Sequence, residues 1–149
     1  MFDRLCLLLL LCTVCLGGCG KRLPPRPSGM PDTTPCTLTV TFGGEKIEGV
    51  GVSLKPKAPV RRWYANGKTD PNGKAVLKTN GYYNGVVPGD YTVSFHKNGL
   101  AELDEQGMPI RTPSLIPVKY TAGQSKETIT VTTEQSVYAF ELTIDNNIN

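Results

Sequence analysis

The sequence has few of the features that would assign it to an enzyme or membrane class. Its 149 residues contain one histidine and one tryptophan, and four of its five cysteines lie within the first nineteen residues. A single apolar run, at residues 5–16, excludes a multi-span membrane protein. The net charge of +3 is dispersed, without the concentrated basic stripe of a nucleic-acid-binding protein. With 39% hydrophobic residues, the chain is an ordinary length and composition for one globular domain.

The apolar run is typical of a signal peptide for export. Its twelve uncharged residues are too few to span a bilayer as a helix, which takes about 20. The sequence Leu16-Gly17-Gly18-Cys19 that follows resembles the lipobox of bacterial lipoproteins. We therefore predict a lipoprotein signal peptide at 1–18 and a lipidated Cys19, carrying diacylglycerol and palmitate. The alternative is an ordinary cleaved signal peptide in which Cys19 is incidental.

Lipidation of Cys19 implies a location at a bacterial membrane. The predicted partner is then the membrane itself, reached through the lipid anchor, with the domain facing the periplasm or the cell surface. Gly20 follows the anchor in place of the Asp that, in some bacteria, retains lipoproteins at the inner membrane. This residue favours the outer membrane.

Residues 19–35 are predicted to be the lipidated cysteine and a proline-rich tether. Five prolines favour extended backbone, which at about 3.1 Å per residue gives a reach of roughly 50 Å. Lys21, Arg22 and Arg26 could favour anionic headgroups, and a plain spacer is an equal alternative.

From residue 36 onward the pattern indicates strands and turns. Polar and apolar residues alternate at 37–42, 50–54 and 91–95, which is the period of a half-buried strand, and 75–79 is predicted to be another strand. Further strands are predicted at 63–69, 127–133 and 136–144. Asn-Gly occurs five times, each a strong turn signal. No segment has a helical period, so residues 36–149 predict an all-β fold: one antiparallel Greek-key β-sandwich of seven to eight strands.

Three turns resemble those of carboxypeptidase regulatory-like domains. They are Phe42-Gly43-Gly44 with the following strand at 50–52, the Thr69-Asp70-Pro71-Asn72-Gly73 turn, and Pro88-Gly89-Asp90-Tyr91 at a strand entrance. The resemblance covers about residues 37–144. It implies a transthyretin-like sandwich and brings no catalytic motif, no cofactor and no metal site.

Candidate chemical groups are scarce. His96 falls on the polar face of its strand, and Cys36 has no other cysteine left in the domain to pair with inside the chain. Cys36 could pair between molecules or be a small buried residue. Glu102, Asp104 and Glu105 form an acidic loop, which we interpret as solvated. No catalytic residues and no metal ligands are therefore predicted, and a hydrolase is the least favoured alternative.

One stretch combines cations with aromatic rings. Arg61, Arg62, Trp63 and Tyr64 could stack on sugar rings or bind an acidic polymer. The alternative, which we favour, is that Trp63 belongs to the core and the cations are its solvated rim.

These patterns predict a non-catalytic, lipid-anchored envelope protein that acts as a binding or adhesion module. Its predicted ligand is an envelope polysaccharide or protein, and no nucleic acid. The alternative function is a structural accessory subunit of an envelope protein complex.

The Cys19→Ala variant is expected to lose lipidation and to remain unprocessed or unanchored. Each buried methylene of an acyl chain contributes about 0.8 kcal/mol, so two or three chains hold a protein firmly at a membrane. Metabolic labelling with a fatty acid measures this directly, and label that persisted in Cys19→Ala would contradict the assignment.

Overall fold

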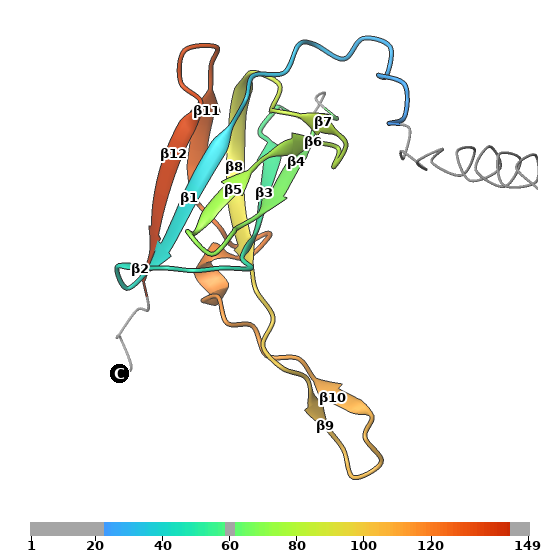
Figure 1. Ribbon diagram of the computed structural model, residues 1–149, viewed down its shortest axis with the longest axis vertical. Coiled ribbons are helices and arrows are strands. Elements are labelled where there is room, and N and C mark those ends of the chain that lie inside the picture. The colour runs from blue at the N-terminus through green and yellow to red at the C-terminus, as the bar shows by residue number, and fades with distance from the viewer. Residues whose placement is uncertain (1–22, 59–61, 144–149) are drawn as a thin grey trace, which may run out of the picture.

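The alternating segments assemble into an all-β fold of two sheets around one shared core (Figure 1). The computed structural model describes residues 23–58 and 62–143. The first sheet contains, in spatial order, β12 (Val137–Leu142), β1 (Thr37–Phe42) and β2 (Glu45–Lys46), with β5 (Lys74–Val76) also paired to β1. The second sheet contains β11 (Thr128–Val131), β8 (Gly89–His96), β3 (Gly51–Pro56), β4 (Ala65–Lys68), β6 (Lys78–Thr79) and β7 (Tyr83–Asn84).

Two elements lie outside these sheets. The strands β9 (Glu102–Leu103) and β10 (Pro109–Arg111) form a two-stranded hairpin that projects from one end of the sandwich (Figure 1). A short 3-10 helix, η2 (Val118–Tyr120), follows the hairpin and buries Tyr120. Within the described ranges, no helix is long and apolar enough to cross a membrane.

The core is made by the inward faces of the long strands. On β8, Tyr91, Val93 and Phe95 are at most 1% exposed, as their alternation predicts. The Phe95 ring meets the ring of Phe140 edge-on, with centroids 5.4 Å apart, and so joins the two sheets. The hydroxyl of Tyr91 donates to the carbonyl of Val87 at 2.5 Å, which satisfies its only buried polar atom.

Two of the predicted strands differ from the sequence expectation. The strand predicted at 63–69 begins only at Ala65, because β3 ends at Pro56, which lacks the N–H needed to extend the ladder towards Trp63. The strand predicted at 75–79 divides at Leu77: β5 pairs with β1 and β6 pairs with β4, so this segment crosses from one sheet to the other.

The pairing of β1 with β12 is parallel, whereas the sequence predicts antiparallel neighbours. Parallel partners need a long crossover, and here all the intervening chain provides it by way of the second sheet. The ladder is tied to the β1–β2 turn by Glu141, whose carboxylate accepts from the hydroxyl of Thr41 and from the Gly44 N–H. These bonds lower the pKa of Glu141.

The described residues hold twelve strands, four of them only two residues long, so the ladders are more finely divided than the seven to eight strands expected.

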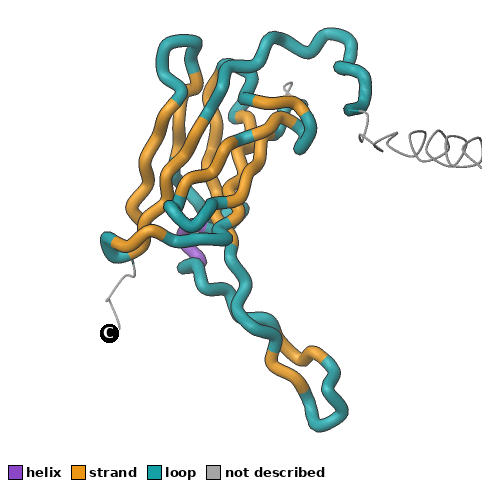
Figure 2. The backbone as a smooth tube through the Cα atoms, viewed as in Figure 1, coloured by secondary structure: helices purple, strands orange, loops and turns teal. Residues whose placement is uncertain are grey.

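The described part of the proline-rich segment lies on the sandwich as a loop (Figure 2). Thr34 and Val86 exchange two backbone hydrogen bonds of 2.8 Å, and Met30 is 8% exposed. The hydroxyl of Tyr83 donates to the carbonyl of Pro25 at 2.9 Å. Hydrogen bonds at Pro25 and at Thr34 therefore hold the two ends of this segment at the β6–β7 end of the domain.

Val93→Asp is expected to unfold the domain. Val93 is fully buried, and an unpaired buried charge costs several kcal/mol, which is comparable to the whole stability of a small domain, about 5–15 kcal/mol. Val76→Asp is the matched control, because Val76 is 57% exposed and its carboxylate would remain in water. Thermal unfolding followed by circular dichroism compares the two variants, and an equal loss of melting temperature would contradict the assigned core.

Candidate functional site: a trough on the outer face of the second sheet

The outer face of the second sheet carries small and polar side chains. Because successive residues of a strand point to opposite faces, Val52 and Leu54 enter the core while Ser53 faces outward. The register sets Ser53 between Asn66 of β4 and Ser94 of β8. These small side chains form the floor of a shallow polar surface.

Two adjoining clefts follow this floor. The first has a volume of about 780 Å³, the second about 270 Å³, and they share Ser53 and Asn66. We call the joined clefts the outer trough. Its polar, aromatic and charged lining residues are Ser53, Lys55, Tyr64, Asn66, Lys68, Thr92, Ser94, His96, Lys97, Asn98 and Ser125.

One end of the outer trough is cationic. Gly49 has a φ of 79°, which favours glycine, and the terminal Cε atoms of Lys68 and Lys97 lie 3.6 and 3.9 Å from the point where its Cβ would stand. The ammonium of Lys97 donates to the Glu48 carbonyl at 2.7 Å. The ring of His96 lies over Gly51, where any larger residue would overlap it.

A buried threonine holds the backbone of this cationic end. The Thr69 hydroxyl accepts from the Val50 N–H at 2.8 Å and donates to the Ile47 carbonyl at 2.7 Å. The Gly49 N–H donates to the Thr69 carbonyl, and the Thr69 N–H donates to the Val50 carbonyl. These hydrogen bonds join the end of β4, which carries Lys68, to the turn that contains Gly49.

The other end of the outer trough is aromatic. Tyr64 is 52% exposed and lines it just before β4 begins, beside Lys55. Ala122, Gly123 and Ser125 form the opposing wall. The trough thus offers hydroxyl and amide groups along its floor, an exposed ring at one end and positive charge at the other.

The structure describes three of the four surface residues proposed from sequence. Arg61, like the proposed lipidation site Cys19, lies outside the described residues. Arg62 is exposed, and Trp63 is half-buried without belonging to the core cluster. Of the three described residues, Tyr64 alone lines the outer trough.

Sequence reasoning missed the cationic end and the floor. Lys68, His96 and Lys97 come from two strands that are distant in sequence, and no motif joins them. The alternation at 50–54 and 91–96 did predict that the polar residues of these strands, such as Ser53 and Ser94, face outward. Which of them lie side by side depends on the register of the strands.

Other candidate groups have structural partners. Cys36 is a free thiol, 2% exposed, and its burial raises the pKa of the thiol to about 11, so the reactive thiolate is scarce at neutral pH. The carboxylate of Asp70 accepts from the N–H groups of Asn72 and Lys74 within its own turn. Among the described residues, no group of three His, Cys, Asp or Glu side chains is placed to hold a metal ion.

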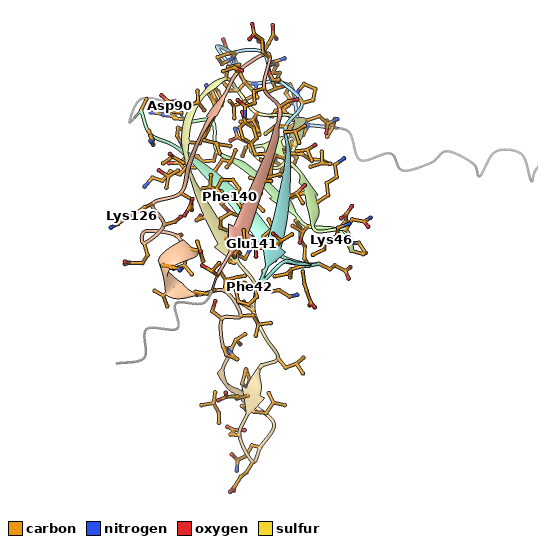
Figure 3. All side chains as sticks on the ribbon, turned by 90° about the vertical axis from the view of Figure 1, so that its left-hand side faces the viewer. Phe42, Lys46, Asp90, Lys126, Phe140 and Glu141 are labelled. Carbon is orange, nitrogen blue, oxygen red and sulfur yellow. The ribbon has the colours of Figure 1, made fainter. Side chains whose placement is uncertain are left out.

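The projecting hairpin is a second surface feature. The segment 100–115, which we call the arm, displays apolar side chains to solvent (Figure 3). Leu100, Leu103, Met108, Ile110 and Leu115 are between 51% and 92% exposed. The expected acidic loop is part of this arm, where the carboxylate of Asp104 accepts from the backbone N–H groups of Gln106 and Met108 in the hairpin turn.

Comparisons with known proteins leave the family unassigned. No family model matches the chain, and no curated protein matches it. Among solved structures, a 9R-lipoxygenase from Cyanothece aligns with a TM-score of 0.39 and 16% identity over 87% of this chain. The alignment covers 20% of the lipoxygenase chain, and a similarity at this level carries no argument about fold or function.

Proposed function

We propose that the protein is a non-catalytic, lipid-anchored binding module of the bacterial envelope that holds a polysaccharide in its outer trough. The observation that carries this proposal is the trough itself, an open polar groove across three strands of a rigid sheet. Its floor of Ser53, Asn66 and Ser94 offers donors and acceptors suited to sugar hydroxyls. The exposed ring of Tyr64 offers an apolar face for a sugar ring.

A binding role accords better with this lining than a catalytic one. No aspartate or glutamate of residues 23–58 and 62–143 lines either cleft of the trough, whereas glycoside hydrolysis ordinarily uses a pair of carboxylates. An open groove with a rigid floor suits recognition of a polymer segment, because the chain can pass through it without threading.

We further propose that Cys19 carries the lipid anchor and that the outer membrane is the host membrane. Only residues 20–24 separate Cys19 from Pro25, which is fixed to the domain, so the backbone between them reaches at most roughly 20 Å. The β6–β7 end would then lie near the membrane, and the arm, at the opposite end in Figure 1, would point away from it.

The resemblance to carboxypeptidase regulatory-like domains is part of the same proposal. It is supported by the all-β sandwich and by the three turns that lie between strands, including the Asp70 turn whose carboxylate caps two backbone amides. A transthyretin-like Greek-key order is the specific topology proposed for the sandwich.

Tyr64→Ala is expected to weaken binding of extracted envelope polysaccharide about fivefold while leaving the melting temperature unchanged, since loss of one stacking contact is worth roughly 1 kcal/mol. Tyr82→Ala is the matched control, because Tyr82 is 54% exposed and does not line the trough. Affinity electrophoresis compares the variants with the wild type. Equal retention of all three proteins by the polysaccharide would refute the trough as its binding site.

The arm favours a second candidate function, that of a structural accessory subunit of an envelope complex. An isolated two-stranded hairpin is marginally stable in water, and this one exposes four large apolar side chains at 103, 108, 110 and 100. Because the arm points away from the proposed anchor, its partner would be an envelope protein with an apolar groove rather than the lipid surface.

A photo-crosslinking residue in place of Leu103 is expected to yield a discrete protein adduct in cells if this second function holds. The same residue in place of Val76 provides the control, since Val76 and Leu103 are 57% and 59% exposed. Adducts of equal intensity at both positions, or none at Leu103, would dismiss the arm as a docking element.

A further inference from the structure

The outer trough carries charge of one sign. Lys55, Lys68 and Lys97 line it, and none of the described residues that line it is acidic. This imbalance is local, because the whole chain has 16 basic and 13 acidic side chains. A neutral polysaccharide would need no such lining.

The two lysines at the Gly49 end are arranged as a pair. Their Cε atoms lie 3.6 and 3.9 Å from the point where a Cβ of Gly49 would stand, so both side chains border the space above a residue that has no side chain. The Lys97 ammonium uses one of its three N–H groups on the Glu48 carbonyl, which leaves two donors. Two cationic side chains that flank one glycine favour an anion between them.

Among the described residues, no carboxylate forms an ion pair with either lysine. Glu48 and Asp70 border a neighbouring cleft of about 520 Å³ that also touches Lys68 and Lys97. The Asp70 carboxylate is engaged by two backbone amides of its own turn. In the described part of the chain, the one ion pair within 4.0 Å joins Arg26 and Asp32, at the other end of the domain.

We infer that the ligand of the outer trough is an acidic polysaccharide and that Lys68 and Lys97 bind its anionic group, an inference that rests on the proposed function. The uncharged part of the polymer lies along Ser53 and Asn66 towards Tyr64, and the anion occupies the space above Gly49, between the two lysines. The ring of His96, held over Gly51, forms the wall beside that anion.

The test compares polygalacturonate with its fully methyl-esterified form, two probes that share a backbone and differ in charge. Binding of the processed full-length chain in nonionic detergent is measured by calorimetry. The wild type is expected to prefer the acidic form about tenfold, because two exposed ion pairs contribute up to about 1 kcal/mol each and 1.4 kcal/mol is a factor of ten. Lys68→Gln/Lys97→Gln should lose that preference and keep its affinity for the ester.

The matched control is Lys46→Gln/Lys74→Gln, which removes the same charge from exposed lysines of the first sheet. This control should retain the preference, and an equal loss in both double variants would overturn the inference. Single-stranded DNA is a second control, because it is a polyanion that lacks the hydroxyl pattern of polygalacturonate. DNA binding as tight as polygalacturonate binding would also overturn the inference.

Failure of the inference is distinguishable from failure of the proposed function. Equal binding of both polymer forms, weakened by Tyr64→Ala, would keep the trough as a polysaccharide site and remove the role of the lysine pair. Binding of neither form would overturn both.

Discussion

The register between β3 and β8 is the constraint on which both the core and the outer trough depend. Six residue pairs run from Gly51–His96 to Pro56–Tyr91. On one face this ladder places Leu54 beside Val93 in the core, and on the other it places Ser53 beside Ser94 on the trough floor. A slip of one residue would exchange the two faces, burying serines and exposing the core.

Two glycines, Gly49 and Gly51, shape the cationic end of the trough. At Gly51 the missing side chain leaves the space that the His96 ring fills, and at Gly49 the positive φ lets the chain turn below Lys68 and Lys97. Thr69 then locks this turn to the end of β4 with its buried hydroxyl. The cations are thus presented by a short backbone framework rather than by a flexible loop.

The molecule has different surfaces at its two ends and on its side. The proline-rich segment contacts the β6–β7 end, and the arm projects from the opposite end (Figure 1). The outer trough lies on the outer face of the second sheet. In the proposed orientation, an anchor at one end leaves both the trough and the arm accessible. The cationic end of the trough, lined by Lys97 and Asn98, adjoins the base of the arm.

The local pattern of the sequence was sufficient to predict the all-β fold, the inward set of Tyr91, Val93 and Phe95, and the Asp70 turn, because each depends on neighbours a few residues apart. The parallel pairing of β1 with β12, the crossing of the chain at Leu77 and the docking of Thr34 on Val86 were decided only in the tertiary structure. The trough belongs to this second group: Lys68 and Lys97 are 29 positions apart, and only the pairing of β4, β3 and β8 brings them to one glycine. Period-two alternation specifies which side of a strand is polar, but the neighbours across that polar side are set by strand order and register, which alternation does not encode.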